Sequence, residues 1–358
     1  MTTSSHVAVS LPGGGLTGAL YQIGALAALE DGIDGFDGFK VYVGHASGAI
    51  LAAALAGGIS ANRLYRALLD PADPFFPIER RHLMAPDLVE WQRMLTTAFR
   101  AFRHGVARLD PRRVNPPAVG AVDRVLFELD RLEDSLPAGL FTMDRFERFL
   151  AEFFARRDIP GSFGQMPRAL RVVAYELDTG RRVIFGGPGS EHVPVSLACT
   201  ASCALPLFFS PVRIGDGYYI DGGLCSMTHF DVAHEAEAAC TIVVNPRVPV
   251  SMRGSDVPTG HGPVRNMKDK GFLWVLNQSR RIASQAMLER EMENPPNGMQ
   301  VLLIEPGPED GVLFLENTRS FEARRAVLES AYRATRAGVA RWLERHRDFA
   351  ERCGLRAR

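Results

Sequence analysis

The sequence lacks the usual features of a membrane-spanning, disulfide-rich or nucleic-acid-binding protein. No apolar run reaches the roughly 18 residues that cross a bilayer, and the segment from Met1 to Val9 lacks the regions of a signal peptide. The five cysteines form no CxxC pair, so we expect reduced, buried thiols in a reducing compartment. Lys+Arg and Asp+Glu both number 41, which leaves no net charge to attract nucleic acid. We therefore expect a cytoplasmic protein without a nucleic-acid partner.

What is present indicates an ordinary globular protein of the α/β class. The 358 residues are 46% hydrophobic and 23% charged, which excludes a disordered or fibrous chain. Apolar segments that read as strands alternate with helical segments in the N-terminal part, which is typical of a mostly parallel sheet. The expected strands are 6–11, 40–43, 170–174, 182–185, 218–220, 241–245 and 301–305, and the expected early helices are 19–30 and 49–56. We predict a single domain over residues 1–358, with strands 170–174 and 182–185 joined as a hairpin.

Residues 62–147 form the least regular part of the chain, and we predict that they are a helical cap inserted into the domain. Between Leu88 and Val106 apolar residues recur at helical spacing, opposite a side rich in arginine. Such a helix either packs on the domain, covers an acyl pocket or makes a peripheral contact with an anionic membrane surface. A long helix is predicted over residues 321–350.

The first chemical signal is the glycine-rich turn Gly13, Gly14 and Gly15, between a predicted strand and helix. Glycines allow several backbone N–H groups to converge at a helix N-terminus, where negative charge is favoured. With Gly18 the spacing also matches the dinucleotide fingerprint G-x-G-x-x-G, which makes an NAD-dependent oxidoreductase an alternative. A dinucleotide site needs an acidic residue after the second strand, but that strand ends in Gly44. A third interpretation is that the glycines serve only to make the turn sharp.

The second signal is Gly44-His45-Ala46-Ser47-Gly48, again between a strand and a helix. A nucleophile elbow has the pattern G-x-S-x-G because the strained turn needs small flanking residues. The nucleophile position is therefore 46, and Ala occupies it. Ser47 lies one residue too late to replace it, because adjacent side chains in the turn point in different directions.

The third signal is a run of small residues from Ala198 to Ala204, followed by Asp221-Gly222-Gly223. With these three motifs in this order, the sequence resembles the patatin-like phospholipase family over about residues 7–246. The resemblance implies a three-layer α/β fold and a Ser–Asp dyad that hydrolyses acyl esters of lipids, as phospholipases, lysophospholipases and carboxylesterases do. It implies no cofactor and no metal.

Carried over onto this sequence, the resemblance places the nucleophile at position 46 and the general base at Asp221. Gly13, Gly14 and Gly15 would form the oxyanion hole. Thr17 departs from the family, which commonly has Arg or Lys there. Ala46 departs more seriously, since without a hydroxyl the chain cannot form an acyl-enzyme.

Ala46 leaves several functions open. We favour a nucleophile-to-alanine substitution that inactivates a lipid acyl hydrolase, because the glycines and Asp221 have little structural reason to persist together. A natural lipid-binding pseudoenzyme is the main alternative. The Gly44-His45 pair also resembles the elbow of malonyl-CoA acyltransferases, which makes acyl transfer by the same dyad a further alternative.

Overall fold

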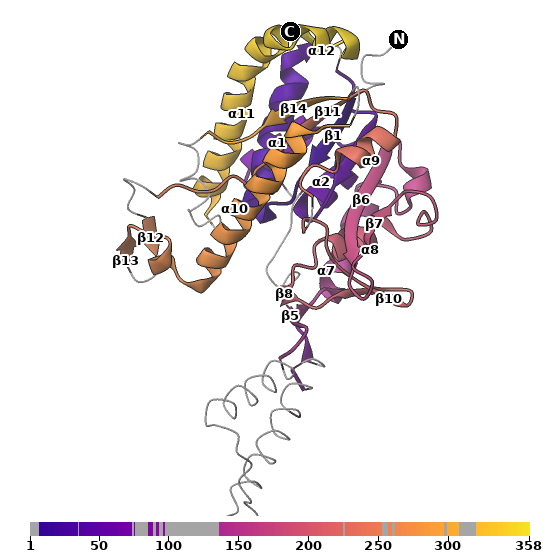
Figure 1. The fold of residues 1–358 in the computed structure, drawn as a ribbon, viewed down its shortest axis with the longest axis vertical. Coiled ribbons are helices and arrows are strands. Elements are labelled where there is room, and N and C mark those ends of the chain that lie inside the picture. The colour runs from indigo at the N-terminus through magenta and orange to yellow at the C-terminus, as the bar shows by residue number, and fades with distance from the viewer. Residues whose placement is uncertain are drawn as a thin grey trace, which may run out of the picture.

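A computed structural model describes residues 7–34, 36–73, 75, 85–88, 91–92, 96, 136–224, 226–252, 257–259, 262–296, 299–307 and 320–358. Within these ranges the main sheet has eight strands in the order β14-β11-β1-β3-β6-β10-β9, with β7 paired to β6 (Figure 1). The five strands from β14 to β6 are parallel, and the rest are antiparallel. Their bounds are β1 Val7–Leu11, β3 Val41–Gly44, β6 Ala169–Glu176, β7 Arg182–Phe185, β9 Val212–Ile214, β10 Gly217–Asp221, β11 Cys240–Val244 and β14 Gln300–Ile304. The predicted mostly parallel α/β sheet and the hairpin of β6 and β7 are confirmed.

The central strands β1, β3 and β11 are buried on both faces, and their residues alternate between two apolar layers. In β1, Val7, Val9 and Leu11 belong to one layer and Ala8 to the other, as the two-residue period of a strand requires. The first layer contains α1 Gly15–Gly32, α2 Ser47–Ala56, α7 Asp144–Ala155, α8 Val195–Ser202 and α11 Phe321–Arg345, and the second contains α9 Phe230–Glu235. The architecture is therefore the expected three-layer arrangement.

Helices α1 and α11 pack closely against each other in the first layer (Figure 1). A Cβ on Gly24 of α1 would lie 2.3 Å from the carbonyl oxygen of Leu328, so only glycine allows this approach. The predicted C-terminal helix over 321–350 is divided at His346, after which α12 covers Arg347–Cys353. A long helix that the pattern did not indicate, α10, covers Phe272–Glu293.

Most of the predicted cap over 62–147, including most of the apolar stripe between Leu88 and Val106, lies outside the described residues. At its two ends, α3 Ala61–Leu69 packs against α1, and α7 packs against α8. The remaining described elements are short: β2 Ile33–Asp34 with β15 Arg356–Ala357, β12 Val257–Thr259 with β13 Gly262–Val264, β4 Ala85–Pro86 with β5 Gly139–Thr142 and β8 Leu207–Phe209, and the single 3-10 turns Phe163–Gln165 and Lys268–Lys270. Among the helices of the described part, none has the length and apolar character needed to span a bilayer.

The cysteines correct one expectation. Cys240 on β11 and Cys353 on α12 form a disulfide, whereas Cys199 and Cys203 are free. The prediction that all cysteines are reduced thiols is wrong for the bonded pair, which lies 113 positions apart in sequence. The spacing could not reveal it, because the sheet and α11 bring the two residues together only in the fold. Cysteine usage therefore gives no argument for a reducing compartment.

The register of the sheet brings the three sequence motifs to one edge. Leu11, the last residue of β1, pairs with Gly44, the last residue of β3. The glycine-rich turn and the elbow therefore leave neighbouring parallel strands side by side. On the far side of β3, Gly44 pairs with Val172 of β6, and Asp221 of β10 pairs with Ala174, two residues further along β6. Ligand sites of α/β sheets lie at such carboxyl edges.

Candidate active site

The chain makes a sharp turn between β3 and α2, and Ala46 stands at its apex. Ala46 has φ 50° and ψ −132°, a backbone conformation that costs a non-glycine residue about 1–3 kcal/mol. A Cβ on Gly48 would lie 1.9 Å from the carbonyl oxygen of Leu11, and one on Gly44 would lie 2.6 Å from that of Gly48. Both flanking positions therefore need glycine, which is the geometry of a nucleophile elbow.

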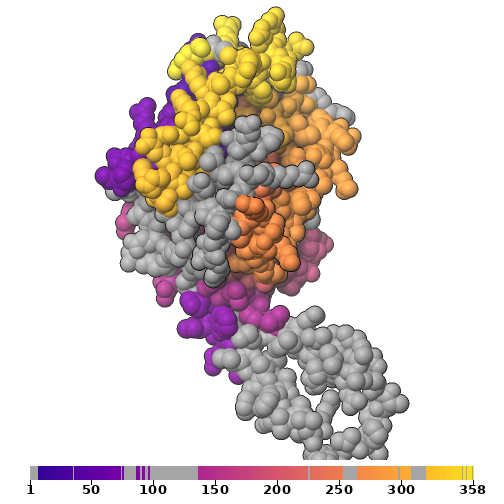
Figure 2. All heavy atoms as spheres, turned by 90° about the vertical axis from the view of Figure 1, so that its left-hand side faces the viewer, coloured from indigo at the N-terminus to yellow at the C-terminus, as the bar shows by residue number. Residues whose placement is uncertain are grey.

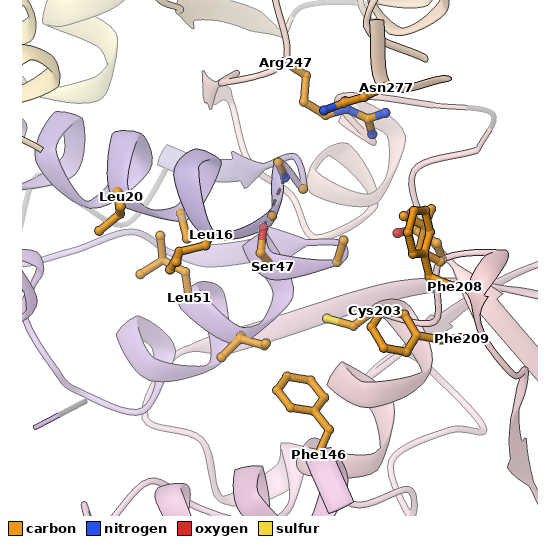
Figure 3. Close-up of a pocket in the computed structure, with 18 of the residues that line it drawn as sticks. Leu16, Leu20, Ser47, Leu51, Phe146, Cys203, Phe208, Phe209, Arg247 and Asn277 are labelled. Atoms are coloured by element: carbon orange, nitrogen blue, oxygen red, sulfur yellow. Dashed lines mark hydrogen bonds between the residues drawn. The ribbon is translucent and has the colours of Figure 1, made fainter. Parts of the chain in front are cut away.

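The glycine-rich turn lies directly against the elbow. A Cβ on Gly13 would lie 2.4 Å from the Cβ of Ala46, so the turn leaves room for a side chain at position 46 only because residue 13 is glycine. The N–H of Gly13 approaches both ring nitrogens of His45 at 3.4 Å. The N–H of Gly14 donates to Ser47 Oγ at 3.1 Å (Figure 3). Within the described residues the N–H of Gly15, at the start of α1, has no acceptor.

These contacts give the three predicted oxyanion donors different surroundings. Gly15, with φ +63°, holds the first position of α1, where the helix dipole favours negative charge. Gly14 shares its N–H with the Ser47 hydroxyl, so that donor becomes available to a ligand when the hydroxyl rotates or is displaced. Gly13 directs its N–H toward the buried imidazole of His45 rather than to an oxygen.

Asp221 ends β10 and is 4% exposed. One carboxylate oxygen, Oδ1, accepts the N–H of Gly223 at 2.7 Å, and the Asp221 N–H donates to the carbonyl of Ala204 at 3.0 Å. Burial raises the pKa of the Asp221 carboxyl above 3.8, although the Gly223 N–H and the positive charges of Arg247 and Arg280 oppose this. A carboxylate with a raised pKa is a better proton acceptor.

His45 joins the elbow to the segment after Asp221. A Cβ on Gly222 would lie 2.8 Å from His45 Cβ, and one on Gly223 would lie 2.4 Å from His45 Cε1. The D-G-G triplet therefore needs both glycines so that Asp221 can approach the elbow. Burial, followed by the neighbouring His229, lowers the pKa of His45 well below 6.5, which leaves the ring neutral. The His45 ring contacts the His229 ring edge-on, with centroids 5.4 Å apart, and neither ring lines the cavity described next.

Ser202, the last residue of α8, also belongs to the site, although nothing in the sequence motifs singled it out. Its Oγ accepts the N–H of Ala46 at 2.9 Å and donates to the carbonyl of Val173 at 2.5 Å. Ser202 is fully buried. The signal for it was present in the run of small residues before Asp221, which brings α8 close to the sheet.

Ala46, Asp221 and the three glycines line a cavity of about 640 Å³. One end is apolar, where Phe146 and Phe209 lie on the far side of Ser47 from Arg247 (Figure 3). Further apolar residues of the lining are Leu20, Ile23, Leu51, Leu64, Leu68, Phe149, Leu150 and Phe153. Arg247 lies on the opposite side of Ser47 (Figure 3), and Arg280, Arg281 and Arg324 also line the cavity. Such a cavity suits a ligand with a long apolar part and a polar group near the elbow.

A family model of the patatin-like phospholipases matches residues 9–234, more than half of the chain. The chain belongs to the patatin-like phospholipase family. This family consists of lipid hydrolases, and the resemblance drawn from the three motifs is thereby confirmed. The matched range contains the elbow, the glycine-rich turn and Asp221.

The individual relatives are distant. An uncharacterized protein of Bacillus subtilis (strain 168), YqhO, is 25% identical over 226 residues, which cover 60% of this chain and 62% of YqhO. The chain thus spans less than two thirds of that relative. Among solved structures, VipD from Legionella pneumophila aligns with 92% of this chain and 66% of its own, at 14% identity and a TM-score of 0.38. The ExoU chain of the ExoU–SpcU complex from Pseudomonas aeruginosa aligns with 95% of this chain and 52% of its own, at 14% identity and the same TM-score of 0.38.

Proposed function

We propose that this site is built to hydrolyse carboxylic esters of acyl lipids by a Ser–Asp dyad, and that Ala46 stands in place of the nucleophile. The observation that carries the proposal is the strained apex at position 46, with φ 50°, on the wall of an apolar cavity that Asp221 also lines. A strained backbone persists only where the surrounding structure enforces it, and it is common at active sites. The alanine side chain itself does not favour this backbone conformation.

With a serine at position 46, the hydroxyl oxygen would attack the ester carbonyl carbon while its proton passes to the Asp221 carboxylate. The carbonyl oxygen would become an oxyanion, stabilised by backbone N–H groups of the glycine-rich turn. Collapse of the tetrahedral intermediate would break the bond to the alcohol, which takes the proton from Asp221. Water would then attack the acyl-enzyme in the same way, and release of the fatty acid would restore the serine.

Backbone donors of this kind contribute strongly when they are preorganised. The loss of one typically costs about 2.7–4 kcal/mol of transition-state stabilisation. Within the described residues the N–H of Gly15 has no acceptor. The N–H of Gly14 donates to the neutral Ser47 hydroxyl, which is a weaker acceptor than an oxyanion. We therefore assign the main oxyanion role to Gly14 and Gly15, with Gly13 as the residue whose missing side chain makes room for position 46.

As it stands, the chain lacks the attacking oxygen, so the proposal extends to binding without cleavage. The intact cavity supports a lipid-binding pseudoenzyme as the second candidate, because removal of a hydroxyl leaves every lining residue in place. We assign no nucleophilic role to Ser47, because it is the first residue of α2 and lies one position past the apex of the turn.

The test is Ala46→Ser, assayed with a soluble short-chain ester and with a fluorophosphonate probe. We expect hydrolysis and labelling of residue 46, while the parent chain and Ala46→Ser/Asp221→Asn show neither. A folded Ala46→Ser protein that neither labels nor cleaves any acyl ester would contradict the dyad and favour the pseudoenzyme. Labelling of Ser47 in the parent chain would contradict the placement of the nucleophile.

A further inference from the structure

The first turn of α10 leaves bulky apolar side chains in contact with solvent. Phe272 is 70% exposed, Leu273 is 53% exposed and Val275 is 43% exposed. Because successive residues of a helix point about 100° apart, these three side chains point to different sides of the helix. The turn thus exposes apolar surface on more than one side, whereas a helix that merely covers a domain buries its apolar side. Figure 2 shows this part of the chain, in orange, at the surface of the molecule.

Basic residues lie directly before this turn. Arg265 and Lys268 are exposed, and Lys270 is half-buried. The two lysines are two of the three in the whole chain, so lysine is concentrated at this point of the surface. Asp269, the acidic residue between them, is hydrogen-bonded to Asn266. Three basic residues against this one acid leave a surplus of positive charge beside the apolar turn.

The basic and apolar residues are also in direct contact. Lys270 Nζ lies over the ring of Trp274, 4.3 Å from its centroid, which is within the range of a cation–π interaction. This contact holds an ammonium group against the side of the helix turn. We call the whole cluster the α10 patch, and it consists of Arg265, Lys268, Lys270, Phe272, Leu273, Trp274 and Val275.

Exposed apolar surface that is bordered by charged residues marks a site of contact with a protein or a membrane. The α10 patch suits a bilayer better than a protein. Its apolar part is one helix turn, which is small against the roughly 800 Å² that each partner contributes to a stable protein interface. Its side chains also point in several directions, and a fluid bilayer needs no complementary shape. Aromatic and leucine side chains enter the boundary between head groups and acyl chains, while basic residues stay at acidic head groups.

We propose that the α10 patch docks this protein on a bilayer that contains anionic lipids. Phe272, Leu273 and Val275 enter the interface, and the basic residues before them contact the head groups. The same turn reaches the candidate active site, because Leu273 and Trp274 line its cavity. Docking at the patch therefore brings the cavity next to the bilayer surface. The inference goes beyond the proposed function, since docking needs neither a nucleophile nor a general base.

The test uses the chain as it stands, in cosedimentation with two kinds of vesicle. One kind is phosphatidylcholine alone, and the other is phosphatidylcholine mixed with phosphatidylglycerol. We expect binding to the mixed vesicles to be at least about tenfold tighter, since each basic residue near an anionic surface contributes about fivefold. Added salt should weaken this binding, because it screens the charges.

Phe272→Ser/Val275→Ser tests the apolar part of the patch, and neither residue lines the cavity. We expect this protein to bind the mixed vesicles at least about tenfold more weakly, because it loses apolar surface that the interface would bury. Ile282→Ser is the matched control, since Ile282 is 56% exposed on the same helix but lies outside the patch. The control should bind like the parent chain.

Lys268→Gln tests the basic part of the patch. It should weaken binding to the mixed vesicles by about fivefold and leave binding to neutral vesicles unchanged. Lys40→Gln removes the same charge from another part of the surface, where Lys40 pairs with Glu237. This control should bind both kinds of vesicle like the parent chain.

The outcomes separate this inference from the proposed function. Failure to bind the mixed vesicles, equal binding to both kinds, or equal losses in Phe272→Ser/Val275→Ser and Ile282→Ser would overturn the docking surface. A dimer that Phe272→Ser/Val275→Ser dissociates, without any effect on vesicle binding, would make the patch a protein interface and also overturn it. Each of these results leaves ester hydrolysis standing, because Ala46→Ser tests it with a soluble ester. Vesicle binding that requires the patch, together with an Ala46→Ser protein that cleaves nothing, would support docking and contradict the hydrolase.

Discussion

The Oγ of Ser202 accepts the backbone N–H of Ala46 at 2.9 Å, and the same hydroxyl donates to the carbonyl of Val173 at 2.5 Å. This single hydroxyl links the apex of the elbow, the end of α8 and the middle of β6. Because Asp221 pairs with the next residue of β6, Ala174, the link also fixes the position of the elbow relative to Asp221. Ser202 is therefore a positioning residue of the site.

Ser202→Ala removes both hydrogen bonds and leaves a buried amide and a buried carbonyl without this partner. We expect a loss of about 1–3 kcal/mol in the free energy of unfolding. In the Ala46→Ser background we also expect a lower kcat with little change in KM for a soluble ester, because the apex loses its orientation. Denaturant unfolding and steady-state kinetics measure the two effects.

Thr200→Val is the matched control, since Thr200 lies on the same helix and its hydroxyl donates only to the carbonyl of Ser196 at 2.8 Å. It should leave kcat unchanged. If Thr200→Val and Ser202→Ala lower kcat equally, α8 acts through its general packing and the specific link has no role.

Gly48→Ala tests whether the elbow depends on the close approach of α2 to β1. The added methyl group would lie 1.9 Å from the Leu11 carbonyl oxygen, which belongs to the backbone of a central strand and cannot move aside. We expect a loss of about 3 kcal/mol or more, at the severe end of single substitutions. Gly164→Ala, at an exposed site with nothing within 4 Å of the new atom, should change stability by less than about 0.5 kcal/mol. A stable Gly48→Ala protein would mean that the turn has a different geometry.

The sequence allowed the fold class and the neighbourhood of the motifs to be predicted, for identifiable reasons. The strands that carry the motifs are short apolar runs followed by glycine, such as Val41–Gly44, and parallel strands bring their carboxyl ends to one edge. The glycines at positions 44 and 48 are demanded by backbone contacts, so they leave a sequence signal.

What could not be predicted depends on contacts between distant segments. Nothing local marks Arg247 as a cavity residue, because it enters the cavity only after β11 has taken its place in the sheet. The helix α10 escaped prediction since its apolar residues include the exposed Phe272 and Leu273, which hide the usual one-sided pattern. The pairing of Cys240 with Cys353 likewise requires the folded sheet.

Ala46→Gly should separate backbone strain from chemistry. Glycine adopts φ 50° without the cost that alanine has there, about 1–3 kcal/mol, and loses about 0.5–1 kcal/mol through greater freedom of the unfolded chain. We expect a net gain of about 1 kcal/mol in stability and no hydrolytic activity. Ala52→Gly, within α2, has no such strain to relieve and should be destabilising. A less stable Ala46→Gly protein would show that the apex is not strained.

Asp221 provides the last test, through pH. Burial raises the pKa of its carboxyl in the folded chain above the unfolded value of 3.8, so the ionised form is disfavoured by folding. This cost is absent below the unfolded pKa, grows as pH rises between the two pKa values and is constant above the folded one.

Asp221→Asn removes a cost that exists only at higher pH. Its stability relative to the chain as it stands should therefore increase from about pH 4 to about pH 8, as measured by denaturant unfolding at several pH values. In the Ala46→Ser background the base must be ionised, so kcat/KM should fall as pH decreases through a midpoint above 3.8. There Asp221→Asn should lower kcat by about 10²–10⁴-fold. Asp216→Asn, on an exposed turn, is the control for loss of a carboxylate away from the site. A stability difference for Asp221→Asn that does not vary with pH would show that Asp221 titrates alike in the folded and unfolded chains, and would remove the argument that burial prepares it to accept a proton.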